Sequence, residues 1–320
     1  MRPSRSRVET NKPEAFATLK RVFFIVGPTA SGKSEIAADV AARCGAEIVS
    51  ADAFQIYRGL PLLTAQPDQA TMEKAPHHLV GSVPVTEEMS AAKFRVLAST
   101  AIEEINRRGR LAIVAGGSGL YVKALTDGLA PLPAINPKLR AELNALSLAE
   151  LNARLAAVDP SGAKKIDQQN KRRVVRALEI FTQTGGPASL QRSQWNHAAA
   201  QAGGVLLLRD RVELYLRINQ RVEEMFLHGV TKEVAAIDEV GPTAAKALGF
   251  DQIRALLAGK TSLAECLAAI QQATRQYAKR QLTWFQRQTN LEPLNLSLFK
   301  DHAAAVDWIL QKVSLLPPLE

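Results

Sequence analysis

The chain has 320 residues, of which 47% are hydrophobic and 22% are charged, enough apolar material for one large or two modest globular domains. Its formal net charge of +9 favours a polyanionic partner, although basic enzymes without such a partner exist. The two cysteines, Cys44 and Cys266, lie far apart, which excludes a disulfide framework and a cysteine-rich zinc site, and no apolar run is long enough to span a membrane. We therefore expect a cytoplasmic protein without a membrane contact.

The first half of the chain alternates predicted strands and helices. After a polar, basic stretch at 1–20, which we expect to be a flexible tail, the apolar run Val22–Val26 predicts a buried strand and Ser34–Arg43 a helix. A second strand, in AEIVSAD, ends at Asp52, and RLAIVAGGSGLY repeats the pattern of buried strand, glycine turn and helix. This alternation predicts an α/β fold with a parallel sheet covered on both faces. Ligands of such sheets bind at the carboxyl ends of the strands, where both glycine turns and Asp52 fall.

The pattern changes at the proline-rich segment GLAPLPAINP, after which only helices are predicted to about residue 200. One more buried strand, Val205–Leu208, follows, and the remainder is predicted to be mostly helical. The sequence therefore predicts an α/β core at 21–130 and 203–320, the latter with C-terminal helices, and a helical insertion at 131–202.

The stretch GPTASGKS matches the phosphate-loop pattern G-x-x-x-x-G-K-[ST] and lies between a predicted strand and a predicted helix. Backbone N–H groups of such a loop and the N-terminus of its helix surround an anion. Lys33 would reach the terminal phosphate oxygens, and the Ser34 hydroxyl would ligate Mg²⁺. The residues expected to hold diphosphate or a nucleotide are Gly27, Pro28, Thr29, Ala30, Ser31, Gly32, Lys33 and Ser34.

The loop alone does not define the reaction. An ATPase or GTPase normally places an aspartate at the end of a neighbouring apolar strand to hold the metal, but LAIVAGGSG ends in glycines. Asp52 is the nearest well-placed acid, and it could accept a proton from a nucleophile that attacks the group bound in the loop. It could equally cap a turn or hold Mg²⁺ through water, so the sequence leaves its role open.

Seven stretches occur together in an order that resembles the tRNA dimethylallyltransferases, also called tRNA isopentenyltransferases. They are GPTASGKS, SADAFQIYRG, APHHLV, VAGGSGLYVKAL, RRVVRALE, ALGF and TRQYAKRQLTWF, and the resemblance covers about Phe23 to Arg287. Many families share the phosphate loop, whereas TRQYAKRQLTWF and the pair D-x-x-Q with GG-[ST]-GLY are far more specific. We expect no C-terminal zinc-finger extension of the kind some eukaryotic members carry, so the resemblance is to the bacterial type.

The resemblance implies a P-loop NTPase-like core with a tRNA-binding helical insertion, and a role for each motif. The dimethylallyl group of dimethylallyl diphosphate would be joined to the exocyclic amine of the adenosine 3′ to the anticodon, and diphosphate would leave. Lys33 and Mg²⁺ on Ser34 would stabilise the leaving group, Asp52 would take a proton from the amine, and Ser118 would complete the catalytic set. The partners would be the tRNA anticodon stem-loop and dimethylallyl diphosphate, and we expect a monomer. The implied tRNA contacts are Asp52, Ala53, Phe54, Gln55, Ser118, Arg140, Gln169, Asn170, Lys171, Arg172, Arg173, Lys246, Ala247, Leu248, Gly249, Phe250 and Asp251.

Four positions depart from the family pattern. Ala53 stands where serine is usual, and Ser118 stands where threonine is usual but keeps the hydroxyl. Gln66 replaces a common lysine, which puts any phosphate or backbone contact there in doubt, and Phe250 lacks the hydroxyl of a frequent tyrosine.

Basic residues gather in two segments. The first, SGAKKIDQQNKRRVVRALE, lies in the predicted insertion, where RNA backbone would need neutralising. In a long predicted helix from Ser262 to about Arg287, Arg275 and Lys279 are hypothesised to add charge near the diphosphate. A stripe at helical spacing in this helix is predicted to be core: Leu263, Leu267, Ile270, Thr274, Tyr277, Gln281 and Trp284. For the adjacent His77 and His78 we expect structural polar contacts, since no third metal ligand is evident.

Three alternatives remain beside the prenyltransferase. A P-loop small-molecule kinase would use Asp52 to activate a hydroxyl, but it needs an arginine-rich lid and leaves the basic insertion unexplained. A non-catalytic RNA-binding protein with a relic loop would be expected to have lost Lys33, Ser34 or Asp52. An adenylate isopentenyltransferase, which uses free nucleotide, would have less need of a basic insertion.

Overall fold

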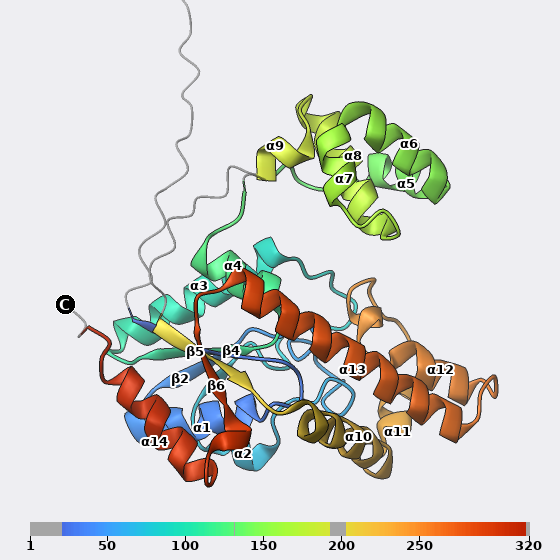
Figure 1. Cartoon of the computed structure of the whole chain (residues 1–320). Coiled ribbons are helices and arrows are strands. Elements are labelled where there is room, and N and C mark those ends of the chain that lie inside the picture. The colour runs from blue at the N-terminus through green and yellow to red at the C-terminus, as the bar shows by residue number, and fades with distance from the viewer. Residues whose placement is uncertain (1–20, 131, 193–202, 318–320) are drawn as a thin grey trace, which may run out of the picture.

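The computed structural model describes residues 21–130, 132–192 and 203–317, so the predicted tail at 1–20, Pro131 and 193–202 lie outside the described residues (Figure 1). At its centre is a six-stranded sheet with the order β3-β2-β4-β1-β5-β6, in which every pair of neighbours is parallel. The predicted α/β fold with a parallel sheet is therefore confirmed. The strands are β1 Val22–Val26, β2 Glu47–Ser50, β3 His77–His78, β4 Ala112–Gly116, β5 Gly203–Leu208 and β6 Glu292–Asn295.

Helices cover both faces of this sheet, which is why its central strands are continuous apolar runs. Phe24 and Val26 of β1 pack into one core cluster with α3 (Ala91–Arg107) and α4 (Gly119–Thr126). Phe23 and Ile25 point to the other face and pack with α1 (Lys33–Cys44) and α14 (His302–Val313). The alternation along β1 thus joins two helical layers across one strand.

The strand register brings the loops that follow β1, β2, β4 and β5 to the same edge of the sheet. Val26 at the end of β1 lies opposite Gly116 of β4 and Leu206 of β5, so the loops that follow these strands leave the sheet side by side. Gly27 N donates to Gly116 O at 3.3 Å. A side chain at Gly116 would place its Cβ only 2.3 Å from the Ala51 carbonyl oxygen, so only glycine allows this close approach of β4 to the end of β2.

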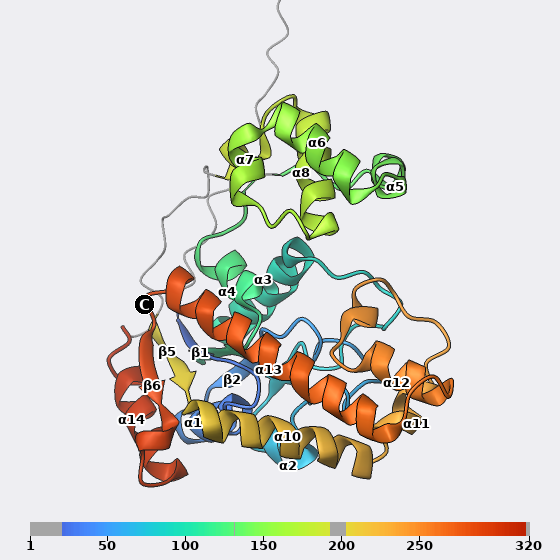
Figure 2. The same cartoon turned by 45° about the vertical axis from the view of Figure 1, so that its right-hand side comes forward.

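A group of helices between β4 and β5 packs around a core of its own. Leu151, Leu155, Val174 and Ile180 are buried among these helices. Both views show the group lying apart from the sheet and its covering helices (Figures 1 and 2). We propose that this segment is the separate unit expected at 131–202. Its helices are α5 Pro137–Ala145, α6 Leu148–Val158, α7 Pro160–Lys165, α8 Lys171–Thr184 and α9 Ala188–Arg192.

The chain after β5 is helical apart from one strand. Helices α10 to α13 enclose a third core cluster, which includes Val222, Val234, Phe250 and Ile270. The expectation of a mostly helical remainder missed β6, a short edge strand in which Pro293 gives no alternating pattern. No helix in the described ranges is long and apolar enough to cross a bilayer. The remaining elements are α2 Gln69–Glu73, α10 Arg211–Leu227, α11 Val230–Ala235, η1 Ala244–Lys246, α12 Phe250–Leu257, α13 Leu263–Gln288 and η2 Leu296–Leu298.

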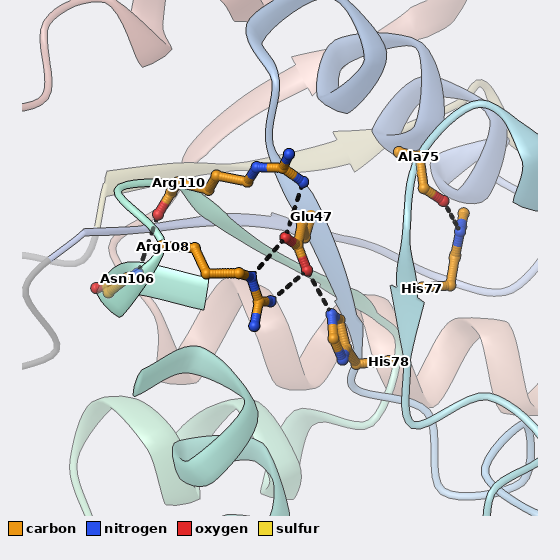
Figure 3. Close-up of polar contacts among 7 residues, drawn as sticks. All are labelled: Glu47, Ala75, His77, His78, Asn106, Arg108 and Arg110. Atoms are coloured by element: carbon orange, nitrogen blue, oxygen red, sulfur yellow. Dashed lines mark hydrogen bonds and ion pairs between the residues drawn. The ribbon is translucent and has the colours of Figure 1, made fainter. Parts of the chain in front are cut away.

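A buried carboxylate ties the other edge of the sheet together. Glu47, 3% exposed at the start of β2, accepts hydrogen bonds from Arg108 Nη2 at 2.7 Å and Arg110 Nη1 at 3.1 Å, and its Oε2 lies 2.7 Å from His78 Nε2 (Figure 3). His77 Nδ1 lies 2.8 Å from the Ala75 carbonyl oxygen. The two histidines therefore make the structural contacts expected of them, and no group of three or more potential metal ligands from His, Cys, Asp and Glu occurs in the described part of the chain.

The stability of this cluster should depend on pH. Burial by itself would raise the pKa of Glu47, but hydrogen bonds and charge from Arg108, His78 and Arg110 hold it below its ordinary value of 4.5. The ionised carboxylate therefore stabilises the folded state above pH 4.5, and this contribution is lost as the pH falls through the folded pKa. We expect Glu47→Gln to lower the free energy of unfolding by about 1–3 kcal/mol at pH 7. Urea denaturation should show this difference shrinking in acid, and a difference independent of pH would contradict the account.

Candidate active site

The phosphate loop, Gly27–Ser34, forms the turn from β1 into α1 and holds an unusual backbone. Ala30 and Gly32 both lie in the left-handed region, with φ of 63° and 91°. For a residue with a side chain this conformation is strained, and at Ala30 it is held by a hydrogen bond from Arg217 Nε to the Ala30 carbonyl at 3.0 Å. The turn is thus fixed from outside by α10.

Cationic side chains surround this loop. Arg209 Nε donates to the Ser31 carbonyl at 2.8 Å, and Arg221 Nη2 donates to Thr29 Oγ1 at 2.8 Å. Lys33 Nζ lies within the loop and donates to the Pro28 carbonyl at 3.3 Å. Together with Arg217, three arginines and one lysine converge on a single turn. The sequence does not predict these three arginines as site residues, because only the pairing of β5 with β1 places them there.

Arg209 pairs with Glu213, but burial leaves Lys33 and Arg221 short of negative charge. Desolvation lowers the pKa of Lys33 to about 8, with the Asp52 carboxylate acting in the opposite direction and Arg221 adding to the lowering. Desolvation also lowers the pKa of Arg221. In the described part of the chain, Arg221 Nε and Ser31 Oγ are buried without a hydrogen-bond partner. Buried donors and desolvated cations are stabilised by an anion, so the site fits a diphosphate group.

Asp52 lies directly after β2 beside this loop. Its Oδ1 accepts hydrogen bonds from the backbone N–H groups of Phe54 at 2.9 Å and Gln55 at 3.3 Å. The backbone N–H of Ala53, the residue directly after Asp52, donates to Ser118 Oγ at 2.8 Å. The turn-capping role that the sequence left open is therefore real, but it occupies Oδ1 and leaves the carboxylate facing a pocket. Burial raises the pKa of the Tyr277 hydroxyl, and the nearby Asp52 carboxylate raises it further.

One pocket joins the phosphate loop to an apolar interior. Thr29 of the phosphate loop lines it, together with Arg221, which donates to Thr29, and Asp52, whose charge acts on Lys33. Most of the other lining residues are apolar. Such a pocket suits a small ligand with an anionic head and a short apolar tail. The other lining residues are Phe54, Leu63, Thr64, Ala65, Val222, Met225, Ala247, Leu248, Ile270, Thr274 and Tyr277.

Helix α13 connects the two glycine turns through one buried amide. Gln281 Oε1 accepts from Thr29 N at 2.8 Å, and its Nε2 donates to the Gly117 carbonyl at 2.8 Å. Thr274 and Ile270, about two and three turns before Gln281, are buried, as expected of the predicted core stripe, yet both line the pocket. The prediction is wrong for Leu263, which is 50% exposed. The helical spacing identified the inward face but not that it carries site residues.

The other residues of α13 singled out by sequence lie away from the loop. Arg275 Nη1 donates to Asn219 Oδ1 at 2.6 Å, and its guanidinium lies 5.9 Å from the centre of the Tyr215 ring. Lys279 is exposed. Cationic charge beside the phosphate loop comes from Lys33, from α10 and from Arg209, which directly follows β5. Neither Arg275 nor Lys279 has a contact with the loop among those the structure describes.

Some of the residues expected to bind tRNA hold the helical unit together. Arg140 forms a bidentate pair with the buried Glu179 at 2.6 and 2.7 Å. Lys171 Nζ donates to two backbone carbonyls at 2.8 and 2.7 Å, and Asn170 caps α8. Gln169, Arg172 and Arg173 are exposed around the same helix start.

The expected tRNA contacts at 246–251 lie partly at the pocket and partly near the helical unit. Ala247 and Leu248 line the pocket, Phe250 is buried, Asp251 is exposed, and Gly249 begins α12 with φ of 97°. Burial lowers the pKa of Lys246, and the nearby Arg172 and Arg140 lower it further. Glu88 acts in the opposite direction. Arginines from α8 and α5 therefore lie close enough to Lys246 of η1 to repel its charge, as at a site for a polyanion.

Two departures from the family pattern now have a physical account. Gln66 Nε2 donates to the carbonyls of Gln55 at 2.9 Å and Tyr57 at 2.8 Å, so the side chain closes its own loop. Gln55 Nε2 in turn donates to the Ala65 carbonyl at 2.7 Å. Phe250 is 4% exposed in the third core cluster. Because this residue is phenylalanine and not tyrosine, no buried hydroxyl there needs a hydrogen-bond partner.

The fold and the site together define a P-loop-type α/β protein with a cationic loop beside an apolar pocket. The family model described as IPP transferase matches residues 55–288, and the chain belongs to this family. It is 41% identical over 290 residues to the tRNA dimethylallyltransferase of Akkermansia muciniphila, covering 91% of this chain and 98% of that protein. It is 42% identical over 282 residues to the tRNA dimethylallyltransferase of Geobacter metallireducens, covering 85% and 91%. The resemblance noted in the sequence is thereby confirmed.

Solved structures give the same result. A tRNA Δ(2)-isopentenylpyrophosphate transferase from Staphylococcus epidermidis is 32% identical, with a TM-score of 0.67 and coverage of 92% of this chain and 98% of that one. A eukaryotic dimethylallyltransferase acting on tRNA is 26% identical, with a TM-score of 0.77 and coverage of 94% and 81%.

Proposed function

We propose that this protein is a tRNA dimethylallyltransferase. It transfers the dimethylallyl group of dimethylallyl diphosphate to the exocyclic amine of the adenosine 3′ to the anticodon and releases diphosphate. One observation carries the proposal: a single pocket joins a loop ringed by four cations to the Asp52 carboxylate and an apolar lining. The names of the relatives at about 40% identity support it.

The chemistry follows from which charges form. The bond between the allylic carbon and the diphosphate oxygen breaks, and its electron pair leaves with the diphosphate, where Lys33, Arg217 and Arg221 stabilise it. The amine nitrogen forms the new bond to carbon, and its proton goes to Asp52. The apolar lining keeps water from the cation-like carbon. The target base must leave its stack to enter, as with other enzymes that act on bases.

A magnesium ion fits this site as part of the proposal. Mg²⁺ prefers oxygen ligands and is usually held by one or two protein groups together with substrate phosphates. The Ser34 hydroxyl in the first turn of α1 offers such a group, and Ser31 Oγ of the same loop is buried without a hydrogen-bond partner among the described residues. When bound, the ion would neutralise charge on the departing diphosphate. Ser118, which accepts from Ala53 N and contacts Tyr277, would help to hold the catalytic turn.

The tRNA would lie between the helical unit and the core, where Arg140, Arg172 and Lys246 gather. We expect Arg172→Ala to weaken tRNA binding and to reduce the salt slope by about one, because one phosphate contact is lost. Turnover at saturating tRNA should not change. Binding measured by fluorescence anisotropy between about 50 and 200 mM salt checks this. Lys300→Ala, an exposed lysine just before α14, is the matched control, and equal effects of the two changes would contradict the placement.

The proposed function itself is tested by incubating the protein with Mg²⁺, unmodified tRNA and labelled dimethylallyl diphosphate. Parallel reactions replace the diphosphate with labelled ATP, or the tRNA with free adenosine monophosphate. Transfer to tRNA alone is the expected result. Phosphate transfer from ATP would favour a kinase, and prenylation of the free nucleotide would favour an adenylate isopentenyltransferase. A monomer in the cytoplasm remains part of the proposal.

A further inference from the structure

A short helical turn, Leu60–Gln66, forms one wall of the pocket. Its backbone closes through hydrogen bonds from Thr64 N to Leu60 O at 3.1 Å and from Gln66 N to Pro61 O at 2.9 Å. The turn is anchored by the fully buried Leu60 and the 5% exposed Leu63. Three of its residues line the pocket beside Asp52 and Arg221: Leu63, Thr64 and Ala65.

A single distant carboxylate satisfies the N-terminal amides of this turn. Glu233 on α11 accepts from Leu62 N through Oε2 and from Leu63 N through Oε1, both at 2.8 Å. Pro61, which precedes them, has no N–H group to satisfy. The first amides of such a turn have no partner within the turn, so an acceptor from outside must satisfy them. Glu233 therefore fixes the start of the wall from an element 170 residues away along the chain.

The position of this start decides the shape of the apolar part of the pocket. Leu63 packs in the third core cluster with Ile270, which also lines the pocket. A Cβ built on Gly249 would lie 3.1 Å from Leu63 Cδ1, so the side chain is held against the start of α12 with no spare room. A shift of the Leu62 and Leu63 backbone would move Leu63, Thr64 and Ala65 together and widen the pocket.

We propose that Glu233 is a positioning residue that holds this wall so that the pocket takes a five-carbon prenyl group and excludes longer ones. The inference rests on the proposed function. It depends on the carboxylate having two acceptor oxygens aimed at two adjacent amides. A glutamine can accept from only one of them and turns its own NH₂ group toward the other. The substitution therefore removes one hydrogen bond to the wall, and α11 keeps its apolar contacts.

The test compares Glu233→Gln with the wild-type protein on two substrates, dimethylallyl diphosphate and geranyl diphosphate, with the same tRNA. We expect the kcat/KM for dimethylallyl diphosphate, divided by that for geranyl diphosphate, to fall roughly tenfold or more in Glu233→Gln. Displacements of about 1 Å at a binding site alter reaction rates strongly. KM for dimethylallyl diphosphate should rise, and KM for tRNA should not. The ratio does not depend on the fraction of active protein, so a variant that is merely less stable would leave it unchanged.

Glu47→Gln is the matched control, since it makes the same chemical change at a buried carboxylate on the opposite edge of the sheet. It should lower stability and keep the wild-type ratio. Glu233→Asp, which retains the charge but is one methylene shorter, should give an intermediate ratio and serves if the glutamine variant does not fold. A wild-type ratio in the folded Glu233 variants would overturn the inference alone. Failure of the wild-type protein to transfer the dimethylallyl group would overturn the proposed function as well.

Discussion

Replacing Asp52 with asparagine is expected to slow prenyl transfer by roughly 10²–10⁴, the usual loss when a general base is removed. The asparagine side-chain oxygen can still accept from the Phe54 and Gln55 amides, so the turn after β2 should survive. Single-turnover rates at saturating tRNA measure the chemical step directly, and tRNA binding measured separately should change little. Asp52→Ala removes the turn cap as well, so it should lose the same chemistry and in addition some stability.

An aspartate that caps a helix elsewhere in the core offers the control. Asp68 accepts from Thr71 N at 2.8 Å at the start of α2, outside the pocket. Asp68→Asn should leave the single-turnover rate unchanged, because its carboxylate faces no reacting group. If Asp52→Asn were as active as Asp68→Asn, Asp52 would be a structural cap only, and the proton would have to leave by another route.

The parts of the site that the sequence predicted are those encoded locally. The phosphate loop follows from a contiguous motif between a strand and a helix, and Asp52 follows from the end of the next apolar run. Both are placed by the parallel sheet, whose existence the alternation of strands and helices already implies. The six-strand order was not needed for either.

The parts that escaped prediction depend on long-range packing. Arg217 and Arg221 reach the loop only because β5 is the neighbour of β1, which no local pattern states. Gln281 lies on a helical stripe that resembles ordinary core, and its two hydrogen bonds to distant turns become visible only in three dimensions. Arg140 was expected to contact tRNA, and its bidentate pair with Glu179 shows that a basic residue in a charged segment can also have an internal partner.

Lys33→Met is expected to abolish most turnover and, at the same time, to stabilise the folded protein. The loss of activity should reach roughly 10²–10³, the range found when one donor to a developing negative charge is removed. The gain in stability follows from burial, since Lys33 is 9% exposed and its pKa falls from 10.5 to about 8. Each pKa unit corresponds to about 1.4 kcal/mol, so the charged lysine costs the empty protein on the order of a few kcal/mol at pH 7.

The pH dependence of this gain separates a buried functional cation from ordinary repacking. The folded pKa of Lys33 lies below the unfolded one, so the cost of the charge is complete below pH 8 and disappears as the pH rises toward 10.5. The stability advantage of Lys33→Met over wild type, measured by urea denaturation, should therefore shrink between these values. Lys300→Met, at an exposed position, should show no such trend. Inorganic diphosphate should reverse the order, stabilising the wild type far more than Lys33→Met, because only the wild type offers the anion a buried positive charge. If diphosphate stabilised both proteins equally, Lys33 would not be the partner of the leaving group.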